Sequence, residues 1–190
     1  MITSIPIKDA PITYYPTFVK DPDNIFVNLR DNLDWEQRDA PRQEYYCNDF
    51  PEPYVYGRGE GRRTYLTRSY HPDITSIRQE LEGLTGTVFE VCFLNRYLTQ
   101  KNSLHWHSDD SIEMDDERPI GIVSLGEERE IWFRLKNQEN NSVVEKIKLA
   151  HGSLCLMHAG MQDIWEHRIP KASFICGERI SLTFRGFKVL

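Results

Sequence analysis

The sequence predicts an α+β chain, mainly β, in which two helices pack on one sheet of a double-stranded β-helix, or jelly roll. The first observation is that two segments of the N-terminal half, 22–35 and 72–86, repeat apolar residues at helical spacing. The second is that residue 87 begins a series of short apolar segments separated by turns. Helices followed by a run of short strands are typical of two packed sheets with the helices on one outer face.

Length and composition indicate an ordinary globular protein. The 190 residues carry a net charge of −6 and fit a single domain over 1–190. No apolar run approaches the ~20 residues of a membrane span, and the N-terminus lacks a basic region followed by an apolar core. We therefore expect a cytoplasmic monomer with no membrane partner. The cysteines form no Cys-x-x-Cys pair, which argues against a zinc ribbon or finger.

The first helix is predicted over roughly 22–35, after a segment 1–20 that holds one short strand. Asp21 is a favourable N-cap, Pro22 suits the first helical position, and Asp23 complements the positive end of the helix dipole. One buried stripe follows from the apolar spacing: Ile25, Phe26, Leu29 and Leu33.

The next segment, 36–70, is rich in Pro, Gly, Tyr and Arg, which predicts loops with extended pieces around 44–46 and 54–56. The glycines of GRGEG do not match a phosphate-binding loop, because no Gly-Lys-Ser/Thr follows them. We expect a mobile flap here instead. Its basic cluster, which we expect to hold phosphates, comprises Arg58, Arg62, Arg63 and Arg68.

The second helix is predicted to begin at Pro72 and to stop at Gly86. Its apolar stripe is Ile74, Ile77, Leu81 and Leu84. The strand that follows from Thr87 is apolar on both faces, so it is buried between other layers. Phe89, Val91, Phe93, Asn95 and Tyr97 share one face, and Val88, Cys92 and Leu94 the other. Further strands are expected at 120–125, 130–135, 144–150, 153–157 and 178–187.

Three side chains able to bind metal alternate along one extended segment: His105, His107 and Asp109. Residues two apart in a strand share a face, so we expect two of these to bind one ion. A distant histidine, His158 or His167, completes a set of two histidines and one carboxylate. Such a set suits a non-haem Fe(II) oxygenase. The spacing leaves open which of the two nearby and which of the two distant histidines binds.

The C-terminal strand alternates polar and apolar residues from Arg179 to Arg185. One interpretation is an edge strand with its arginines in solvent. The other is an anion site at the mouth of a barrel. The six residue steps from Arg179 to Arg185 span about 20 Å along a strand. If each arginine side chain leans inward by roughly 6 Å, a gap of about 8 Å remains between the two guanidinium groups. That gap matches a five-carbon dicarboxylate, which arginine binds in bidentate fashion.

Several motifs, in order, resemble one known family. They are Pro41-Arg42, Tyr54-Val55-Tyr56-Gly57, Leu94-Asn95-Arg96-Tyr97, Trp106-His107-Ser108-Asp109-Asp110, Ser124-Leu125-Gly126, Trp165 to Lys171, and Arg179 to Arg185. Together, from about 41 to 187, they resemble the AlkB family of Fe(II)- and 2-oxoglutarate-dependent dioxygenases, most of all its short bacterial and phage members. The resemblance implies a jelly-roll dioxygenase domain with a nucleotide-recognition flap at about 41–70.

The resemblance also implies a role for particular residues. The iron ligands, and hence the catalytic residues, are His107, Asp109 and His167. The residues that bind 2-oxoglutarate are Asn95, Tyr97, Ser181, Arg179 at the distal carboxylate and Arg185 at the end that chelates iron. The nucleic-acid contacts are Tyr54 and Tyr56 at the target base, Arg58, Arg62 and Arg63 at phosphates, and Ser111 near the lesion.

The implied reaction uses Fe(II), 2-oxoglutarate and O2 to demethylate N-alkylated bases in DNA or RNA, with release of succinate, CO2 and formaldehyde. A single strand is favoured as substrate, because it avoids most of the cost of flipping a base. Two positions depart from the family: Ser111 stands where an acidic residue is common, and Ser181 where Asn is common. The alternatives are the same chemistry on another base or a peptide, and a catalytically silent nucleic-acid-binding module.

Overall fold

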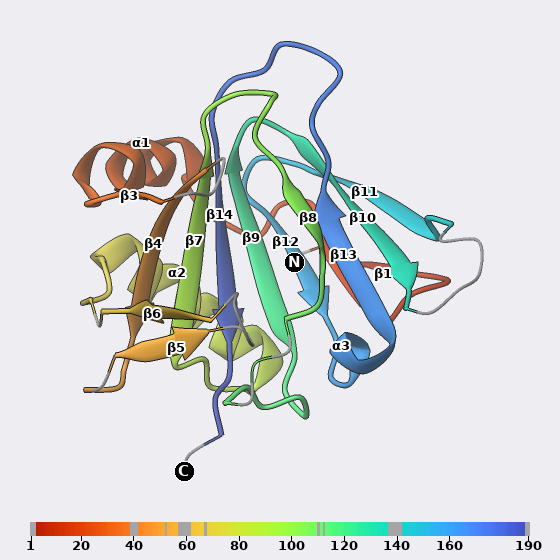
Figure 1. Cartoon of the computed structure of the whole chain (residues 1–190), viewed down its shortest axis with the longest axis horizontal. Helices are drawn as coiled ribbons and strands as arrows, with labels where there is room; N and C mark the ends of the chain where they lie inside the picture. The colour runs from red at the N-terminus through yellow and green to blue at the C-terminus, as the bar shows by residue number, and fades with distance from the viewer. Residues whose placement is uncertain are drawn as a thin grey trace.

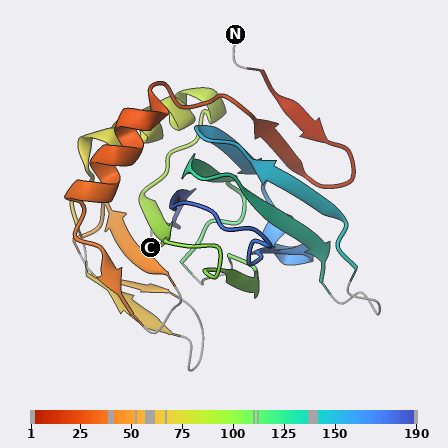
Figure 2. The ribbon, with the colours of Figure 1, turned by 90° about the horizontal axis from the view of Figure 1, so that it is seen from above.

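Two antiparallel sheets, one large and one small, face each other in the computed structural model (Figures 1 and 2). The structure describes residues 3–38, 42–51, 53–56, 62–66, 68–109, 111, 113–136 and 142–188, without the side chains of Tyr54 and Tyr56. The major sheet has the spatial order β1 (Ile5–Ile7), β2 (Ile12–Tyr15), β12 (Ser153–Met157), β9 (Ile120–Gly126), β14 (Arg179–Arg185), β7 (Val91–Tyr97), β4 (Gln43–Asn48) and β3 (Glu36–Gln37). The minor sheet has the order β11 (Glu145–Leu149), β10 (Arg129–Leu135), β13 (Trp165–Ile169) and β8 (Leu104–His107).

The helices are α1 (Pro22–Asn32), α2 (Pro72–Thr85) and the single turn α3 (Met161–Ile164). Helices α1 and α2 lie against the outer face of the major sheet, as Figure 2 shows from above. The fold is therefore the predicted one, mainly β with two helices on one sheet. None of the helices in the described residues is long and apolar enough to cross a membrane.

Helix α1 shows one difference from the expected N-terminus. Asp21 occupies the N-cap position, but it adopts a left-handed conformation with φ 53° and its side chain makes no capping hydrogen bond. The side chain instead accepts a hydrogen bond from the Asn24 amide. Of the predicted stripe, Leu29 and Leu33 are buried, while Ile25 and Phe26 are only partly buried.

Helix α2 begins and ends where the sequence predicts. Gly86 forms its C-cap with φ 68°, a conformation that glycine adopts without steric cost. Three of the four predicted stripe residues are buried, but Leu84 is 38% exposed, so that part of the prediction was wrong. Position 84 lies three residues after Leu81, in the last turn of the helix.

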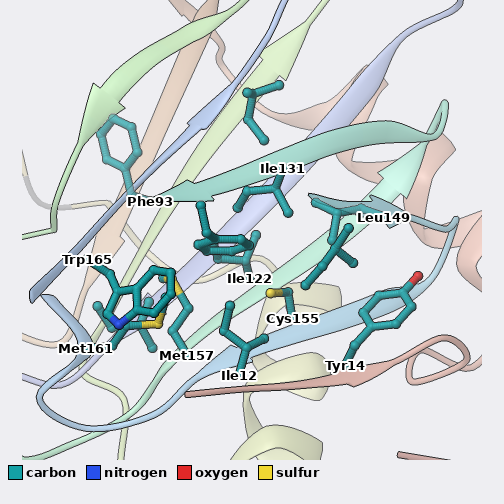
Figure 3. Packing of buried hydrophobic residues seen from close by; sticks show 14 of the residues in the cluster. Ile12, Tyr14, Phe93, Ile122, Ile131, Leu149, Cys155, Met157, Met161 and Trp165 are labelled. Carbon is teal, nitrogen blue, oxygen red and sulfur yellow. The ribbon is translucent and has the colours of Figure 1, made fainter. Parts of the chain in front are cut away.

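Two apolar clusters hold the layers together. One lies between the sheets and includes Phe93, Ile122 and Ile131, which are labelled among its side chains in Figure 3. The other lies between the major sheet and the helices. Strand β7 contributes to both, with Phe93 in the first cluster and Leu94 in the second. This confirms that the strand is apolar on both faces because both faces are covered.

Strand β14 lies at the centre of the major sheet, paired with β9 on one side and β7 on the other. All seven of its residues are buried. Its apolar residues Ile180, Leu182 and Phe184 face the helices. The interpretation of this segment as a solvent-facing edge strand is therefore wrong, and its arginines lie inside the molecule.

Several elements were not predicted or were misplaced. Strand β13 was missed because its sequence, WEHRI, carries three charged or titratable side chains in five residues. Residues 87–90 precede β7 and are not part of it. The N-terminal segment forms two strands where one was expected. In the flap region β5 (Tyr54–Tyr56) pairs with β6 (Arg63–Tyr65), apart from both sheets. The glycines between them lie outside the described residues.

Candidate active site

Two neighbouring strands of the minor sheet bring the distant histidines together. In the pairing of β8 with β13, His107 lies directly opposite His167, and their ring centroids are 4.3 Å apart. Asp109 follows the end of β8 by two residues. One ligand atom from each of His107, Asp109 and His167 can be chosen so that all three lie within 4.8 Å of one another. The geometry therefore selects His107 and His167 from the candidate histidines.

The other two candidates lie elsewhere. The register between β8 and β13 is irregular. Leu104 pairs with Ile169 and His107 pairs with His167, so an advance of three residues along β8 corresponds to an advance of only two along β13. This irregularity breaks the expected alternation, and the His105 side chain is exposed. The prediction that His105, His107 and Asp109 share one face was wrong for that reason. His158 is also exposed, and its Nε2 lies 2.8 Å from the Thr13 hydroxyl.

Hydrogen bonds fix the orientation of the three side chains. Nδ1 of His107 lies 2.8 Å from the carbonyl oxygen of His105, which places the proton on Nδ1 and leaves Nε2 as the lone-pair donor. Arg185 donates from Nη2 to Oδ1 of Asp109 at 2.7 Å. The backbone N–H of Asp109 donates to the buried side-chain oxygen of Gln162 at 2.9 Å. Gln162 was missed by sequence reasoning, since it lies in the unpredicted turn α3.

The protonation states suit metal binding at neutral pH. Burial lowers the pKa of His167 to about 3, and burial also lowers the pKa of His107. Burial alone would raise the pKa of Asp109, but the Arg185 guanidinium holds it well below its usual range. Both imidazoles are therefore neutral and the carboxylate is ionised, as ligands must be before a metal binds. This donor set, two histidines and one carboxylate, is the one that holds non-haem Fe(II) with positions left open.

A buried arginine lies on the other side of the same pocket. Arg179 is fully buried, and its Nε donates to the Ser124 hydroxyl at 2.9 Å. Its two terminal nitrogens, Nη1 and Nη2, make no hydrogen bond of normal geometry to a described residue. The same is true of the buried Tyr97 hydroxyl, and the guanidinium carbon lies 5.1 Å from the centre of that ring. Burial lowers the pKa of Arg179 to about 10, so it stays charged at neutral pH.

A fully buried charge with two unused donors is costly unless a ligand pairs with it. A carboxylate is the group that matches a guanidinium in charge and shape. The pocket that contains Arg179 also contains the metal-binding set, and its lining residues come from both sheets. They are Asn95, Tyr97, Leu104, His107, Asp109, Ile122, Ile131, His167, Ile169, Arg179, Ser181, Thr183 and Arg185. The residues thus fit a metal ion at one end and a carboxylate-bearing ligand at the other.

A polar network that the sequence did not reveal connects this pocket to the flap. Arg42 donates a short hydrogen bond from Nε to the side-chain oxygen of Asn95. Its Nη2 also lies 3.2 Å from Glu44, which is only 2% exposed. From the flap hairpin, Tyr65 donates its hydroxyl proton to Glu44 at 3.3 Å, and Arg63 lies 3.8 Å from the same carboxylate. Glu44 therefore joins β4, β6 and, through Arg42, the Asn95 side of the pocket.

Comparisons with known proteins agree with this geometry. The model of the 2OG-Fe(II) oxygenase superfamily matches residues 21–185. The human alpha-ketoglutarate-dependent dioxygenase alkB homolog 3 is 30% identical over 196 residues, which span 97% of this chain and 68% of the relative. The chain belongs to the AlkB family of 2OG-Fe(II) oxygenases. The cofactor and cosubstrates of this AlkB-family chain are accordingly Fe(II), 2-oxoglutarate and O2.

Two further relatives of this AlkB-family chain are informative. Human DNA oxidative demethylase ALKBH2 is 32% identical over 151 residues, which span 77% of the chain and 56% of that protein. The solved structure of OsALKBH1 superimposes with a TM-score of 0.66 at 16% identity, covering 95% of this chain and all of the other. The second likeness supports the fold alone.

The predicted nucleic-acid contacts of the AlkB-family chain are only partly described. Arg58 and the side chains of Tyr54 and Tyr56 lie outside the described residues. Arg62 is exposed, and Arg63 is half-exposed at its ion pair with Glu44. Ser111 is buried, and its carbonyl oxygen accepts a hydrogen bond from the Met114 N–H.

Arg68 belongs to the same predicted basic cluster, but it points into the protein. It donates to Glu36 and to the Asp34 carbonyl oxygen at 2.5 and 2.6 Å, and its guanidinium carbon lies 5.1 Å from the centre of the Tyr45 ring. These contacts use two of its five N–H donors and hold the guanidinium against the protein. A phosphate contact of Arg68 stays a prediction, and its described contacts are with the protein itself.

Proposed function

We propose that this chain is an oxidative demethylase of N-alkylated bases in DNA or RNA. The observation that carries the proposal is the pocket itself. At one end it holds two neutral imidazoles beside a carboxylate, and at the other a buried guanidinium with two unused donors. The names of two relatives support the class of reaction, since one is an alkB homolog and the other a DNA oxidative demethylase.

In this proposal His107, Asp109 and His167 bind the iron. With O2 as the oxidant, bound iron would couple the decarboxylation of 2-oxoglutarate to the hydroxylation of an N-alkyl carbon. One oxygen atom would go to succinate, with loss of CO2, and the other to the alkyl carbon, which then leaves as formaldehyde. Arg179 pairs with the distal carboxylate of 2-oxoglutarate, and the Tyr97 hydroxyl donates a hydrogen bond to the same molecule. The backbone and side chains around them exclude water and hold the ligand rigidly, because β14 and β7 pair along their full length.

Asn95 and Ser181 lie directly opposite each other on β7 and β14, between the two ends of the pocket. We assign to both residues contacts with the middle of the 2-oxoglutarate molecule. Arg185 donates to Asp109 here, so it acts as a positioning residue for that ligand. A contact of Arg185 with the chelating end of 2-oxoglutarate stays a prediction.

The substrate side rests on fewer described contacts. The flap hairpin β5–β6 is linked to the Asn95 side of the pocket through Glu44 and Arg42. We assign base contacts to Tyr54 and Tyr56 and phosphate contacts to Arg58, Arg62 and Arg63. Ser111 would contact the alkylated base through a neutral hydroxyl, where an acidic side chain is common in the family. Single-stranded substrate is favoured because extrusion of a base from a duplex costs a few kcal/mol, or roughly two orders of magnitude in affinity. A monomeric, cytoplasmic enzyme is the simplest setting for this activity.

A direct test combines product detection with variants of the proposed ligands. Formaldehyde and succinate are measured with Fe(II), ascorbate and 2-oxoglutarate on oligonucleotides that carry 1-methyladenine in single-stranded DNA, duplex DNA or RNA. We expect equal amounts of both products, and a loss of at least a thousandfold in His107→Ala, Asp109→Ala and His167→Ala. The control is His158→Ala, an exposed histidine outside the pocket, which should retain activity.

The same experiment separates the alternatives. Retention of activity in all three ligand variants would contradict the proposal. Succinate formation stimulated by a peptide and not by any oligonucleotide would move the chemistry to another substrate class. Tight oligonucleotide binding with no succinate would favour a catalytically silent binding module.

A further inference from the structure

The outer face of the minor sheet carries a row of alternating cations and indoles that the pocket does not use. The row crosses all four strands: Lys146 on β11, Trp132 on β10, Arg168 on β13 and Trp106 on β8. Trp132 pairs directly with Lys146 on one side and with Arg168 on the other. We call these four residues the Trp–Arg row.

The distances show that the side chains stack on one another. Nζ of Lys146 and the guanidinium carbon of Arg168 each lie 4.3 Å from the centre of the Trp132 ring. Arg168 also lies 5.0 Å from the centre of the Trp106 ring, and Arg134 lies 4.2 Å from it. Cations at such distances interact favourably with aromatic faces.

The charges of this face are only partly balanced. Arg134 forms an ion pair with Glu166, Lys148 pairs with Glu128, and Glu130 accepts a hydrogen bond from the Trp132 N–H. By contrast, Arg168 and Lys146 have no ion-pair partner in the part of the chain that the structure describes. Nε of Arg168 is also buried without a hydrogen bond to those residues. Two cations without an ion-pair partner among the described residues therefore lie among indoles, in a chain whose net charge is −6.

Packing of the sheet does not require these side chains. The inner face of the same strands is complete, with Ile131, Phe133, Ile147 and Ile169 buried in the core. The indoles of the row are only half-buried. Helices α1 and α2 cover the major sheet, so neither lies over this face (Figure 1).

The row also begins next to the pocket. Trp106 precedes His107 on β8, which is the edge strand of the minor sheet, and Arg168 follows His167 on β13. At about 4.8 Å between strands, the row extends about 14 Å from β8 to β11, the length of a few nucleotides. A nucleic-acid single strand that leaves the pocket over the β8 edge therefore meets, in alternation, cations that can bind phosphates and aromatic faces on which bases can stack.

We propose that the Trp–Arg row binds the single-stranded nucleic-acid segment that flanks the target base. Phosphates contact Arg168 and Lys146, and bases stack against the exposed parts of Trp132 and Trp106. A positive track interleaved with aromatic side chains is the arrangement that binds single strands without sequence preference. The inference rests on the proposed function, since it assigns a path to that substrate.

The test compares a long and a short ligand that present the same methylated base. Binding of a single-stranded 15-mer and of a trimer is measured by equilibrium titration at several salt concentrations, for Trp132→Ala and Lys146→Gln. Both positions are remote from the iron ligands in sequence, unlike Arg168. We expect each variant to bind the 15-mer about tenfold more weakly and the trimer as the wild type does. For Lys146→Gln the slope of log K against log salt should fall by about 0.7, the value for one lost phosphate contact.

Lys148→Gln is the matched control, because it removes one lysine charge from the same face of the same strand, two residues away and outside the row. Its 15-mer affinity should stay within twofold of the wild type. Thermal melting of each variant confirms that it is folded. Wild-type affinity for the 15-mer in Trp132→Ala, or an equal loss for both ligands, would overturn the inference.

Failure of the proposed function has a different signature. If the wild type oxidises neither ligand, the demethylase proposal fails, while the difference between 15-mer and trimer binding still decides the role of the row. If both ligands are demethylated and the row variants leave 15-mer binding and its KM unchanged, only the inference about the row fails.

Discussion

At the scale of single residues, two buried arginines of the pocket region show how stability and binding oppose each other. Arg179 is fully buried with two unused donors, whereas Arg129 is 3% exposed and donates from Nη2 to the carbonyl oxygens of Asn102 and Pro170 at 2.9 and 2.6 Å. In the protein alone the first guanidinium hydrogen-bonds to the described residues only through Nε, to the Ser124 hydroxyl, while the second is bound by two carbonyl oxygens. Their replacement should therefore have opposite effects.

We expect Arg179→Met to raise the free energy of unfolding by about 1–4 kcal/mol in the absence of ligand, because it removes an uncompensated buried charge. The same change should weaken 2-oxoglutarate binding at least a hundredfold, since it removes the carboxylate partner. Urea denaturation and calorimetric titration measure the two quantities.

Arg129→Met is the matched control for that prediction. It leaves two carbonyl oxygens without their donor, so it should lower the free energy of unfolding by about 1–3 kcal/mol. If both variants destabilise the protein equally, the unused donors of Arg179 are satisfied within the protein and our account of the pocket is wrong.

At the scale of elements, the flap hairpin is attached to the major sheet through the buried Tyr65 ring, which packs on Tyr46 and Phe93, and through one carboxylate. Glu44 on β4 meets Tyr65 and Arg63 of β6, and it also contacts Arg42, which binds Asn95. On the other side, Arg38 lies 4.6 Å from the centre of the Tyr65 ring. Because these groups share Glu44, the position of the hairpin and that of Asn95 should change together.

Glu44→Gln should destabilise the protein by about 3–5 kcal/mol, because it leaves the largely buried Arg42 guanidinium without its counter-charge. It should also speed amide hydrogen exchange in β6 while exchange in β10 stays unchanged. Hydrogen-exchange mass spectrometry with urea denaturation measures both effects.

Glu36→Gln provides the comparison, because it removes the partner of Arg38 and Arg68 at a site where the carboxylate is about one-third exposed. Its cost should stay below about 1 kcal/mol. Equal exchange rates in β6 of the Glu44 variant and the wild type would show that the hairpin does not depend on this carboxylate.

At the scale of the whole molecule, the metal site joins two strands whose ligands are 60 residues apart in sequence, His107 and His167. A ligand that binds only the folded state adds to its stability. Metal should therefore stabilise the entire domain, and 2-oxoglutarate should add to this only after metal has bound.

Thermal melting with Mn(II), a redox-silent substitute for Fe(II), measures this coupling. At a metal concentration about 100 times Kd, the gain of about 2.7 kcal/mol corresponds to an increase in Tm of roughly 5–10 °C. EDTA should reverse the shift, and His167→Ala should show none. Arg179→Met should keep the metal shift and lose the additional shift from 2-oxoglutarate; an identical response in His167→Ala would refute the assignment of the ligands.

Much of this fold and site was predictable because the signals were local. The stripes of α1 and α2 and the two-faced patterns of β7 and β14 are periodicities that adjacent residues define by themselves. The pairing of His107 with His167 followed from a resemblance of motifs, since spacing alone left His105 and His158 as equal alternatives.

What the sequence did not reveal depends on contacts between distant segments. The irregular register of β8 turns His105 to solvent, and no property of residues 104–107 alone indicates it. Gln162 became important only once α3 placed it beside Asp109. The Trp–Arg row likewise exists only when four strands align, with single members from positions 106 to 168.

Strand β14 presents cations and hydroxyls to the pocket and aliphatic and aromatic side chains to the helices, without exception over seven residues. A slip of one residue against its neighbours would exchange the two faces. It would press Arg179 and Arg185 into the apolar layer beneath the helices and turn Ile180, Leu182 and Phe184 into the polar pocket. The side chains that serve the reaction therefore also disfavour misfolding, because a mispaired β14 would bury two charges in the apolar layer beneath the helices and so raise the free energy of the misfolded state.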